Sequence, residues 1–332
     1  MKGHNVDLHD SYRAAAAALL AVFCAHVFAL TITGPSVAAT NPRRQRNALA
    51  AGRSAPRSHS VGVADNVESP VDLLSPYSGL GSWVDLFNRG PWRNPSWTVR
   101  RMDRRGVKTI YLQTATYGSP DHIVYPRKVA EFIASAHRRG MFVIGWSVPS
   151  FTRPKKDFRR ARAAIDFRTA AGERFDSFGL DIEADLVDKI WKRNARLLDI
   201  SRKLRRVAGP DYPLGAIIPD VHSRYWKNFP YKRLASIYDV MVPMGYFTFQ
   251  ARGYRHVRDY TAANIRVVRR QTGDPAMPVH VIGGIADDVG VAGARGFIRA
   301  VREHRAVGAS LYDFPITSRR TWAELKAVPS RR

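Results

Sequence analysis

Residues 175–184 read Phe-Asp-Ser-Phe-Gly-Leu-Asp-Ile-Glu-Ala, and from Phe178 to Glu183 apolar residues alternate with Gly179, Asp181 and Glu183. Side chains of a β-strand point alternately to its two faces, so this spacing predicts a strand with one apolar face and one face that carries two carboxylates. A carboxylate pair set between buried residues must face a cavity, a cation or a bound partner, because burying an unpaired charge is costly. We therefore expect a functional site at the C-terminal end of this strand, which is where a parallel α/β barrel has its active site.

Apolar strand-like runs alternate with helix-like patterns from residue 79 onward. Each run follows the last by roughly 30 residues, the size of one β-α-β unit. Eight such units in about 250 residues are typical of the TIM barrel, an α/β fold of eight parallel strands. The predicted strands are residues 81–86, 108–113, 142–148, 178–183, 214–218, 240–246, 279–284 and 309–312. The predicted helices include residues 127–139, 157–171, 188–207, 257–271 and 293–304.

A doubly wound open sheet is the structural alternative, because it shows the same alternation of strands and helices. It is disfavoured because no glycine-rich phosphate-binding loop follows the first predicted strand. Gly106, Gly140 and Gly308 stand at or just before predicted strand starts, where glycine ends a preceding helix. Pro243 is unfavourable inside the sixth predicted strand, because proline has no N–H to donate to a neighbouring strand.

The N-terminal segment predicts export. Lys2 and Arg13 precede an apolar run at residues 14–32, and the small residues Ser36-Val37-Ala38 offer a cleavage site, so residues 1–39 are expected to be a signal peptide. The run is close to the length that spans a bilayer, so an uncleaved N-terminal anchor is the alternative. Either outcome predicts a secreted or cell-envelope-associated protein.

The segment after the signal peptide has the composition of a linker. Residues 40–70 are rich in Arg, Ser, Ala and Pro and lack periodicity, which indicates a disordered basic linker. Residues 71–332 are then left for a single TIM-barrel domain. The lone Cys24 lies in the apolar run, so no disulfide is expected once the signal is removed.

The chain is strongly basic, with 53 Lys and Arg against 28 Asp and Glu and a net charge of +25. Such a charge attracts anionic partners, and we expect anionic cell-envelope polymers to be among them. Nucleic acid is not expected as a partner, because the basic residues are scattered and no zinc-finger, RNP or helix-turn-helix pattern accompanies them. Asp220 and His222 could be metal ligands, but no further His stands at a suitable spacing, and we expect neither a metal nor a cofactor.

Acidic, amide and aromatic side chains gather at the predicted C-terminal strand ends. This combination suggests sugar binding, because aromatic rings stack on pyranose rings while carboxylates bind hydroxyls or exchange protons. Each aromatic residue can equally well cap the core. The strand-end candidates are Asp85, Gln113, Trp146, Asp181, Glu183, Asp220, Tyr246, Asp287, Tyr312 and Asp313. Tyr225 and Trp226, after the fifth predicted strand, are expected to be exposed and to contact glycan as well.

The fourth predicted strand resembles a known signature. Residues 176–183 are similar to the motif D-x-x-D-x-D-x-E of the chitinase-type glycoside hydrolases, a superfamily of TIM barrels. Asp176, Asp181 and Glu183 occupy its first, third and fourth acidic positions, whereas Gly179 stands in the second. The resemblance implies a divergent member of that superfamily that acts on poly- or oligosaccharide.

Two further segments carry the resemblance more weakly. Met244-Gly245-Tyr246 is similar to the family's M-x-Y on the sixth strand, although Phe247 replaces the Asp that normally follows. The segment that ends at Tyr312 is similar to the eighth-strand segment that ends in a sugar-stacking Trp. The third-strand pattern S-x-G-G is not found around Trp146.

The resemblance implies roles for three residues. Glu183 would be the general acid that protonates the glycosidic oxygen. Asp181 would orient Glu183, or orient a substrate acetamide that attacks the anomeric carbon. Tyr246 would donate a hydrogen bond to that acetamide. With Gly179 in place of an acid, the third carboxylate of this relay is missing.

The spacing of the two acids supports part of this assignment. Asp181 and Glu183 share one strand face, so their carboxylates lie close together and the pKa of one should rise. A raised pKa suits Glu183 to general acid catalysis near neutral pH.

Two alternatives to this mechanism remain at the level of sequence. One is a two-carboxylate mechanism with Asp220, Asp287 or Asp313 as the second acid. Asp287, with Asp288, would also suit the N-terminus of the helix that follows. The other alternative is a carbohydrate-binding barrel without catalysis.

Overall fold

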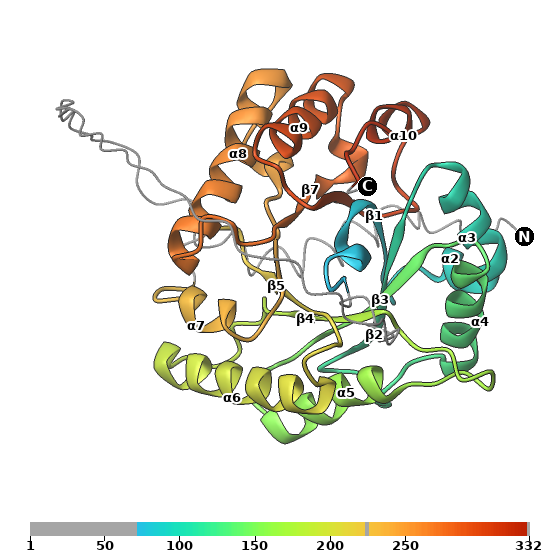
Figure 1. Ribbon diagram of the computed structural model, residues 1–332, viewed down its shortest axis with the longest axis vertical. Coiled ribbons are helices and arrows are strands. Elements are labelled where there is room, and N and C mark those ends of the chain that lie inside the picture. Colours follow the sequence, from blue (N-terminus) through green and yellow to red (C-terminus); the bar gives the residue numbers. More distant parts are fainter. Residues whose placement is uncertain (1–71, 223–225, 331–332) are drawn as a thin grey trace, which may run out of the picture.

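The computed structural model describes residues 72–222 and 226–330 of the chain. Its centre is an eight-stranded parallel sheet in the order β6-β5-β4-β3-β2-β1-β8-β7, with helices around the outside (Figure 1). The strands are β1 (Gly79–Val84), β2 (Thr109–Thr116), β3 (Phe142–Val148), β4 (Ser177–Asp181), β5 (Leu214–Ile218), β6 (Val240–Pro243), β7 (His280–Ile285) and β8 (Gly308–Tyr312). All eight predicted strands are confirmed, each with boundaries shifted by at most a few residues.

The two ends of the sheet meet, which makes it a barrel. Parallel bridges join Met241 to Val279 and Met244 to Ile282, between β6 and β7. The fold is therefore the predicted TIM barrel and not an open doubly wound sheet. Pro243 is the last residue of β6, and the next N–H, that of Met244, bonds to the carbonyl of Ile218 at 2.9 Å. The proline thus ends the strand instead of interrupting it.

The helices cover the outer face of the barrel. They are α2 (Arg89–Arg93), α3 (Pro95–Arg104), α4 (Pro126–His137), α5 (Pro154–Asp166), α6 (Ile190–Ala208), α7 (Tyr231–Ala235), α8 (Gly253–Thr272), α9 (Val291–Glu303) and α10 (Arg319–Leu325), with short 3-10 turns η1 (Ser75–Tyr77), η2 (Phe247–Phe249) and η3 (Ala286–Asp288). The five predicted helices are confirmed. Helices α2, α3, α7 and α10 were not predicted.

The strand β4 shows the expected separation of faces. Phe178, Leu180 and Ile182 are fully buried in the apolar layer between the strands and the helices. The Gly179 side faces the barrel interior, because a Cβ added there would meet Ile217 and Trp146. Asp181 has the same orientation as Gly179, since it lies two residues further along the strand.

A polar network closes the lower, N-terminal end of the barrel. Trp83 Nε1–H donates to Ser310 Oγ at 2.8 Å, and His280 lies between Ser310 Oγ at 3.1 Å and the carbonyl of Tyr77 at 2.9 Å. The carbonyl can only accept, so His280 donates through Nδ1 and accepts through Nε2. Burial lowers the pKa of His280 to about 4, which keeps this imidazole neutral. The side chains that close the lower end of the barrel are therefore hydrogen-bonded to one another and uncharged.

The predicted signal peptide and linker, residues 1–70, lie outside the described residues. Within residues 72–222 and 226–330, no helix combines the length and apolar character needed to cross a bilayer.

Candidate active site

Asp181 and Glu183 lie where β4 opens at the upper, C-terminal end of the barrel. Asp181 is the last residue of the strand and is 5% exposed, whereas Glu183 is half-buried. The N–H of Ile182 still bonds to the carbonyl of Ile217 at 2.8 Å, which keeps the backbone extended beyond the strand. Both acidic side chains therefore point from the same face toward the barrel mouth.

Asp176, the first acid of the fourth-strand motif, is placed at the opposite end of β4. Its Oδ2 accepts the N–H of Val143 at 2.7 Å and lies 3.0 Å from His137 Nε2. These contacts tie the start of β4 to β3 and to the end of α4. Asp176 therefore has a structural role, far from the mouth.

The environment of the acid pair favours its protonated forms. Burial raises the pKa of Glu183 to about 7. Burial, and then the charge of Glu183, raises the pKa of Asp181 well above its usual range. Two buried carboxyl groups of which one feels the charge of the other do not both ionise readily, so the pair retains a proton near neutral pH. This is the state that a general acid needs.

Tyr246 joins the acid pair from the end of β6, two strands away from β4 in the barrel. It is half-buried, follows β6, and packs edge-on against Phe249 with 6.3 Å between ring centroids. Burial raises the pKa of Tyr246 well above its usual range, and the charges of Glu183, Asp181 and Asp313 raise it further. Its hydroxyl therefore remains a hydrogen-bond donor among these carboxyl groups.

A second acidic group completes the mouth at β1 and β8. Tyr312 Oη–H donates to Asp85 Oδ2 at 2.5 Å, while Asp85 Oδ1 accepts the N–H groups of Phe87 at 2.9 Å and Asn88 at 2.8 Å. Asp313 follows Tyr312 directly and is fully buried. Burial and the charge of Asp85 raise the pKa of Asp313 well above its usual range.

Asp85 is the residue whose importance the sequence did not indicate. It was one of ten strand-end candidates, with no partner assigned to it. Its position two residues after Trp83, which faces the barrel interior, was the available signal. The hydrogen bond that gives Asp85 a role comes from Tyr312 at the end of β8, which is paired with β1. Local sequence does not reveal that pairing.

Gln113 and Trp146 add hydrogen-bond donors to the mouth. They are paired across β2 and β3, and both are buried. Gln113 Oε1 accepts the N–H of Leu86 at 2.8 Å, whereas Gln113 Nε2 and Trp146 Nε1 have no acceptor among the described residues. The structure thus gathers Asp181, Glu183, Tyr246, Tyr312, Asp313, Gln113 and Trp146 at one end of the barrel.

The departure at Gly179 has a structural explanation. A Cβ at position 179 would lie 2.9 Å from Cδ1 of Ile217, closer than real side-chain contacts allow. Ile217 is 1% exposed and belongs to the barrel interior. An apolar side chain therefore takes the space that the motif's second acid would need. Phe247, the other departure, packs outward against Phe297 at 5.6 Å between centroids.

Two of the predicted acids lie apart from this group. Asp220 is buried and accepts hydrogen bonds from the hydroxyl of Tyr260 and from the N–H of His222, so it is held against α8. Asp287 is exposed on η3, between β7 and α9. Within the part of the chain that the structure describes, no three His, Cys, Asp or Glu residues are grouped as metal ligands would be.

The expected exposure of Trp226 was wrong. Trp226 is 4% exposed, and its ring packs edge-on against Phe151 and Phe229. Its Nε1–H donates to Asn194 Oδ1 at 2.6 Å, and the Arg193 guanidinium lies 3.9 Å from its ring centroid. The loop after β5 therefore folds this ring beneath the helices. Tyr225, its neighbour, lies outside the described residues.

The fold is shared with solved glycoside hydrolases. A chitinase from Chromobacterium violaceum ATCC 12472 aligns over 77% of this chain and 100% of its own, with a TM-score of 0.55 and 11% identity. The chain has the barrel fold of the chitinase-type glycoside hydrolases. A glycoside hydrolase family 18 N-acetylglucosaminidase from Paenibacillus barengoltzii aligns over 75% of this chain and 99% of its own, with a TM-score of 0.53 and 10% identity.

An enzyme that lyses spore cortex has a similar fold. SleL from Bacillus cereus aligns over 76% of this chain and 74% of its own, with a TM-score of 0.57 and 8% identity. No known family profile matches this chain, and no curated protein has a significantly similar sequence. At these identities the likeness is one of fold, and it confirms the fold that the fourth-strand motif implied.

Proposed function

We propose that this protein is an exported glycoside hydrolase that acts on a cell-envelope or environmental polysaccharide, with Glu183 as the general acid. The observation that carries the proposal is a half-buried Glu183 whose pKa is raised to about 7, at the mouth of a barrel shared with chitinases. A carboxyl group with that pKa is protonated in a large part of the molecules at neutral pH and can donate to a leaving oxygen.

The surrounding groups suit a sugar substrate. Gln113 Nε2, Trp146 Nε1 and Tyr246 Oη–H are donors that can bind hydroxyl or acetamide oxygens. The ring of Tyr312, held by Asp85, can serve as the surface on which a sugar stacks. Asp181 would orient Glu183 or an N-acetyl group of the substrate.

The route after proton transfer depends on the second reacting group. Ile217 fills the place of the motif's second acid, which weakens the support that an attacking acetamide would receive from Asp181. Asp313 supports a two-carboxylate mechanism better than Asp220 or Asp287, because its charge reaches Tyr246 beside the acid pair. In such enzymes, carboxyl groups about 5–5.5 Å apart lead to retention and roughly 6.5–9.5 Å apart to inversion, so NMR of the first product distinguishes the two cases.

A carbohydrate-binding barrel without catalysis is the second candidate. The substitutions Gly179 and Phe247 at motif positions favour it. The buried acid pair disfavours it, because a binding protein gains no stability from two carboxyl groups that disfavour each other's charge.

A hydrolysis panel separates the two candidates. Purified protein is incubated with β-linked oligosaccharides with and without N-acetyl groups, and products and binding are both measured. The enzyme proposal requires cleavage of at least one member. Binding without cleavage across the panel would favour the binding barrel.

Export and an anionic partner complete the proposal. They rest on the signal-like segment at residues 1–39 and on the net charge of +25. We expect the mature protein outside the cytoplasm without its first 39 residues, close to anionic envelope polymers. Mass spectrometry of the exported protein reads its N-terminus directly.

A further inference from the structure

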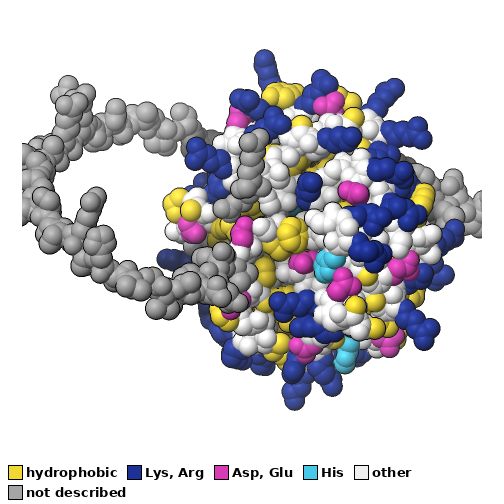
Figure 2. All heavy atoms as spheres, turned by 45° about the vertical axis from the view of Figure 1, so that its right-hand side comes forward, with side chains coloured by type: hydrophobic (Ala, Val, Ile, Leu, Met, Phe, Trp, Pro, Cys, Tyr) yellow, Lys and Arg dark blue, Asp and Glu magenta, His cyan; other side chains and the backbone are white. Residues whose placement is uncertain are grey.

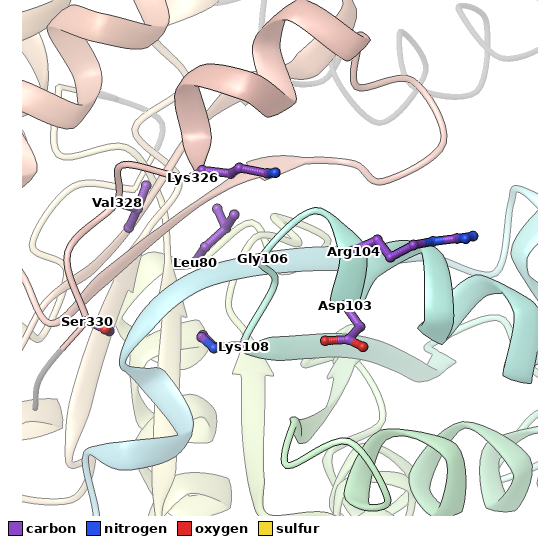
Figure 3. A pocket seen from close by; sticks show the side chains of 8 residues that line it. All are labelled: Leu80, Asp103, Arg104, Gly106, Lys108, Lys326, Val328 and Ser330. Atoms are coloured by element: carbon purple, nitrogen blue, oxygen red, sulfur yellow. The ribbon is translucent and has the colours of Figure 1, made fainter.

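A cavity of about 360 Å³ opens at the lower end of the barrel, opposite the acid pair (Figure 3). It lies between the end of α3, the start of β2 and the segment after α10. Three of its lining side chains are cations and one is an acid; the lining residues are Leu80, Asp103, Arg104, Gly106, Lys108, Lys326, Val328 and Ser330. The acid, Asp103, is 3.9 Å from Arg139 Nε.

The stems of both lysines lie against glycines in the walls. A Cβ on Gly79 would lie 3.3 Å from Cγ of Lys108, and a Cβ on Gly106 would lie 3.7 Å from Cγ of Lys326. Each lysine therefore lies across a bare glycine backbone, which keeps its stem against the protein while its ammonium group remains near solvent.

More cations continue from this cavity along α3 and α10. Arg105 lies over the ring of Trp322 at 5.9 Å, and Arg101 lies over Phe314 at 5.6 Å and Trp97 at 4.6 Å. We call this set the α3–α10 seam; it consists of Arg101, Arg104, Arg105, Lys108, Arg319 and Lys326. Because α3 runs from the mouth to the base of the barrel and Arg101 and Arg104 lie in its last turn, this part of the seam lies beside the cavity.

The cations of the seam are not neutralised by ion pairs in the part of the chain that the structure describes. Among the described residues, none of the six cations forms an ion pair, and the nearby acid Glu324 is held by two hydrogen bonds from Arg295 at 2.9 Å. Burial, and then the positive charges of Arg101, Arg319 and Arg104, lowers the pKa of Arg105. Figure 2, which brings the side of α2, α3 and α4 forward, shows Lys and Arg predominating over Asp and Glu on that face.

We propose that the α3–α10 seam is a second binding site, separate from the acid pair, that takes the negatively charged groups of an anionic polysaccharide. Stacking on Trp97, Phe314 and Trp322 pre-orders Arg101 and Arg105, so their binding loses less side-chain entropy. The cavity is large enough to hold one charged unit between Lys108 and Lys326. Phe314 directly follows Asp313, so a polymer on the seam leads toward the barrel mouth.

The choice of a glycan over another polyanion rests on the proposed function, whereas anion binding by the seam does not. The test therefore measures binding alone. The probe is polygalacturonate, with dextran as the neutral polymer and double-stranded DNA as the alternative polyanion. The seam variant carries Arg104→Ala, Lys108→Ala and Lys326→Ala.

The control variant removes equal charge from α6, which lies on the other side of the barrel in Figure 1. It carries Lys192→Ala, Arg202→Ala and Arg206→Ala; all three residues are exposed, and none forms an ion pair with another described residue. Thermal melts of both variants establish that they are folded.

We expect the seam variant to bind polygalacturonate about tenfold more weakly than the control variant at low salt, and the difference to shrink as salt rises. Neither the seam variant nor the control variant should bind dextran. Equal losses in the two variants would mean that only the net charge matters and would overturn the site. Tighter binding of DNA than of polygalacturonate, with the same loss in the seam variant, would overturn the proposal that the ligand of the seam is a glycan.

Discussion

Ile217 on β5 occupies the space beside Gly179 on β4, with its Cδ1 2.9 Å from the position of a Cβ at residue 179. The two residues form a pair in which one has no side chain and the other fills the gap. A side chain at residue 179 would therefore require Ile217 to move.

This pairing predicts strong coupling between substitutions at the two positions. Gly179→Asp should destabilise the protein by about 2–4 kcal/mol, because it overpacks the interior and buries a carboxyl group. In an Ile217→Ala background the same substitution should cost at least about 1 kcal/mol less. Urea unfolding of the four proteins measures this. Additive costs would show that Ile217 does not occupy the missing acid's place.

Asp313 should carry a stability cost that depends on pH. Its pKa is raised in the folded state, so the folded protein holds a proton that the unfolded chain has released, and stability falls as pH rises above about 4. Asp313→Asn removes that cost and keeps the shape, so it should be more stable than wild type by roughly 1–2 kcal/mol at pH 7.5.

The advantage of Asp313→Asn should be mostly lost near pH 4, where the wild-type carboxyl is protonated in the folded state and about half protonated in the unfolded chain. Denaturant melts at the two pH values provide the measurement. If Asp313 also takes part in the reaction, the stabilised variant should be slower. A variant that is destabilised at pH 7.5 would contradict the assignment of a protonated Asp313.

The His137 ion pairs should stabilise the base of β4 at acidic and neutral pH only. The hydrogen bond with Asp176 raises the pKa of His137, against the opposing effect of burial. A raised histidine pKa contributes stability that is full below about 6.5 and is lost as pH rises through the folded-state value.

His137→Gln should therefore cost up to about 1 kcal/mol at pH 6 and clearly less at pH 9, since the pair is partly exposed. Unfolding curves of wild type and variant at both pH values test it. Arg162→Gln, which breaks an exposed pair on α5, serves as the control without a histidine. A cost that is the same at pH 6 and pH 9 would exclude a charged His137.

Tyr246→Phe should slow the reaction through the loss of one hydrogen bond. A donor to a charged or reacting oxygen contributes about 1.5–3 kcal/mol, so kcat/KM should fall by about 10- to 100-fold. The loss should be larger on N-acetylated substrates if Tyr246 binds an acetamide. Phe249→Leu, which changes the ring beside Tyr246, is the matched control. An equal loss on substrates with and without N-acetyl groups would show that Tyr246 does not bind an acetamide.

The sequence predicted the barrel because buried parallel strands read as short apolar runs, which are recognisable one at a time. It also predicted the orientation of Asp181 and Glu183, because the two-residue period of a strand is local. Helix α3 was missed since arginines interrupt its apolar pattern; in the structure one of them, Arg101, lies over the rings of Trp97 and Phe314.

Contacts between distant strands could not be predicted in this way. The sequence offered Asp220, Asp287 and Asp313 as alternative second acids. In the structure Asp220 is held by Tyr260, Asp287 is exposed, and Asp313 lies near Tyr246. Trp226 was expected to be exposed because it lies in the loop after the fifth strand, but its ring packs against Phe151, which is distant in sequence. The bond between Asp85 and Tyr312 likewise joins residues from the two ends of the barrel sequence.

The most direct test of the account is the pH profile of kcat for wild type and Glu183→Gln on the best substrate of the panel. Burial raises the pKa of Glu183 to about 7, and the acid acts in its protonated form, so wild-type kcat should fall as pH rises above about 7. Glu183→Gln should lower kcat by about 10²- to 10⁴-fold, abolish the alkaline limb and leave glycan binding within a few-fold of wild type. A Glu183→Gln enzyme as fast as wild type, with the same alkaline limb, would contradict the assignment of Glu183 as the acid.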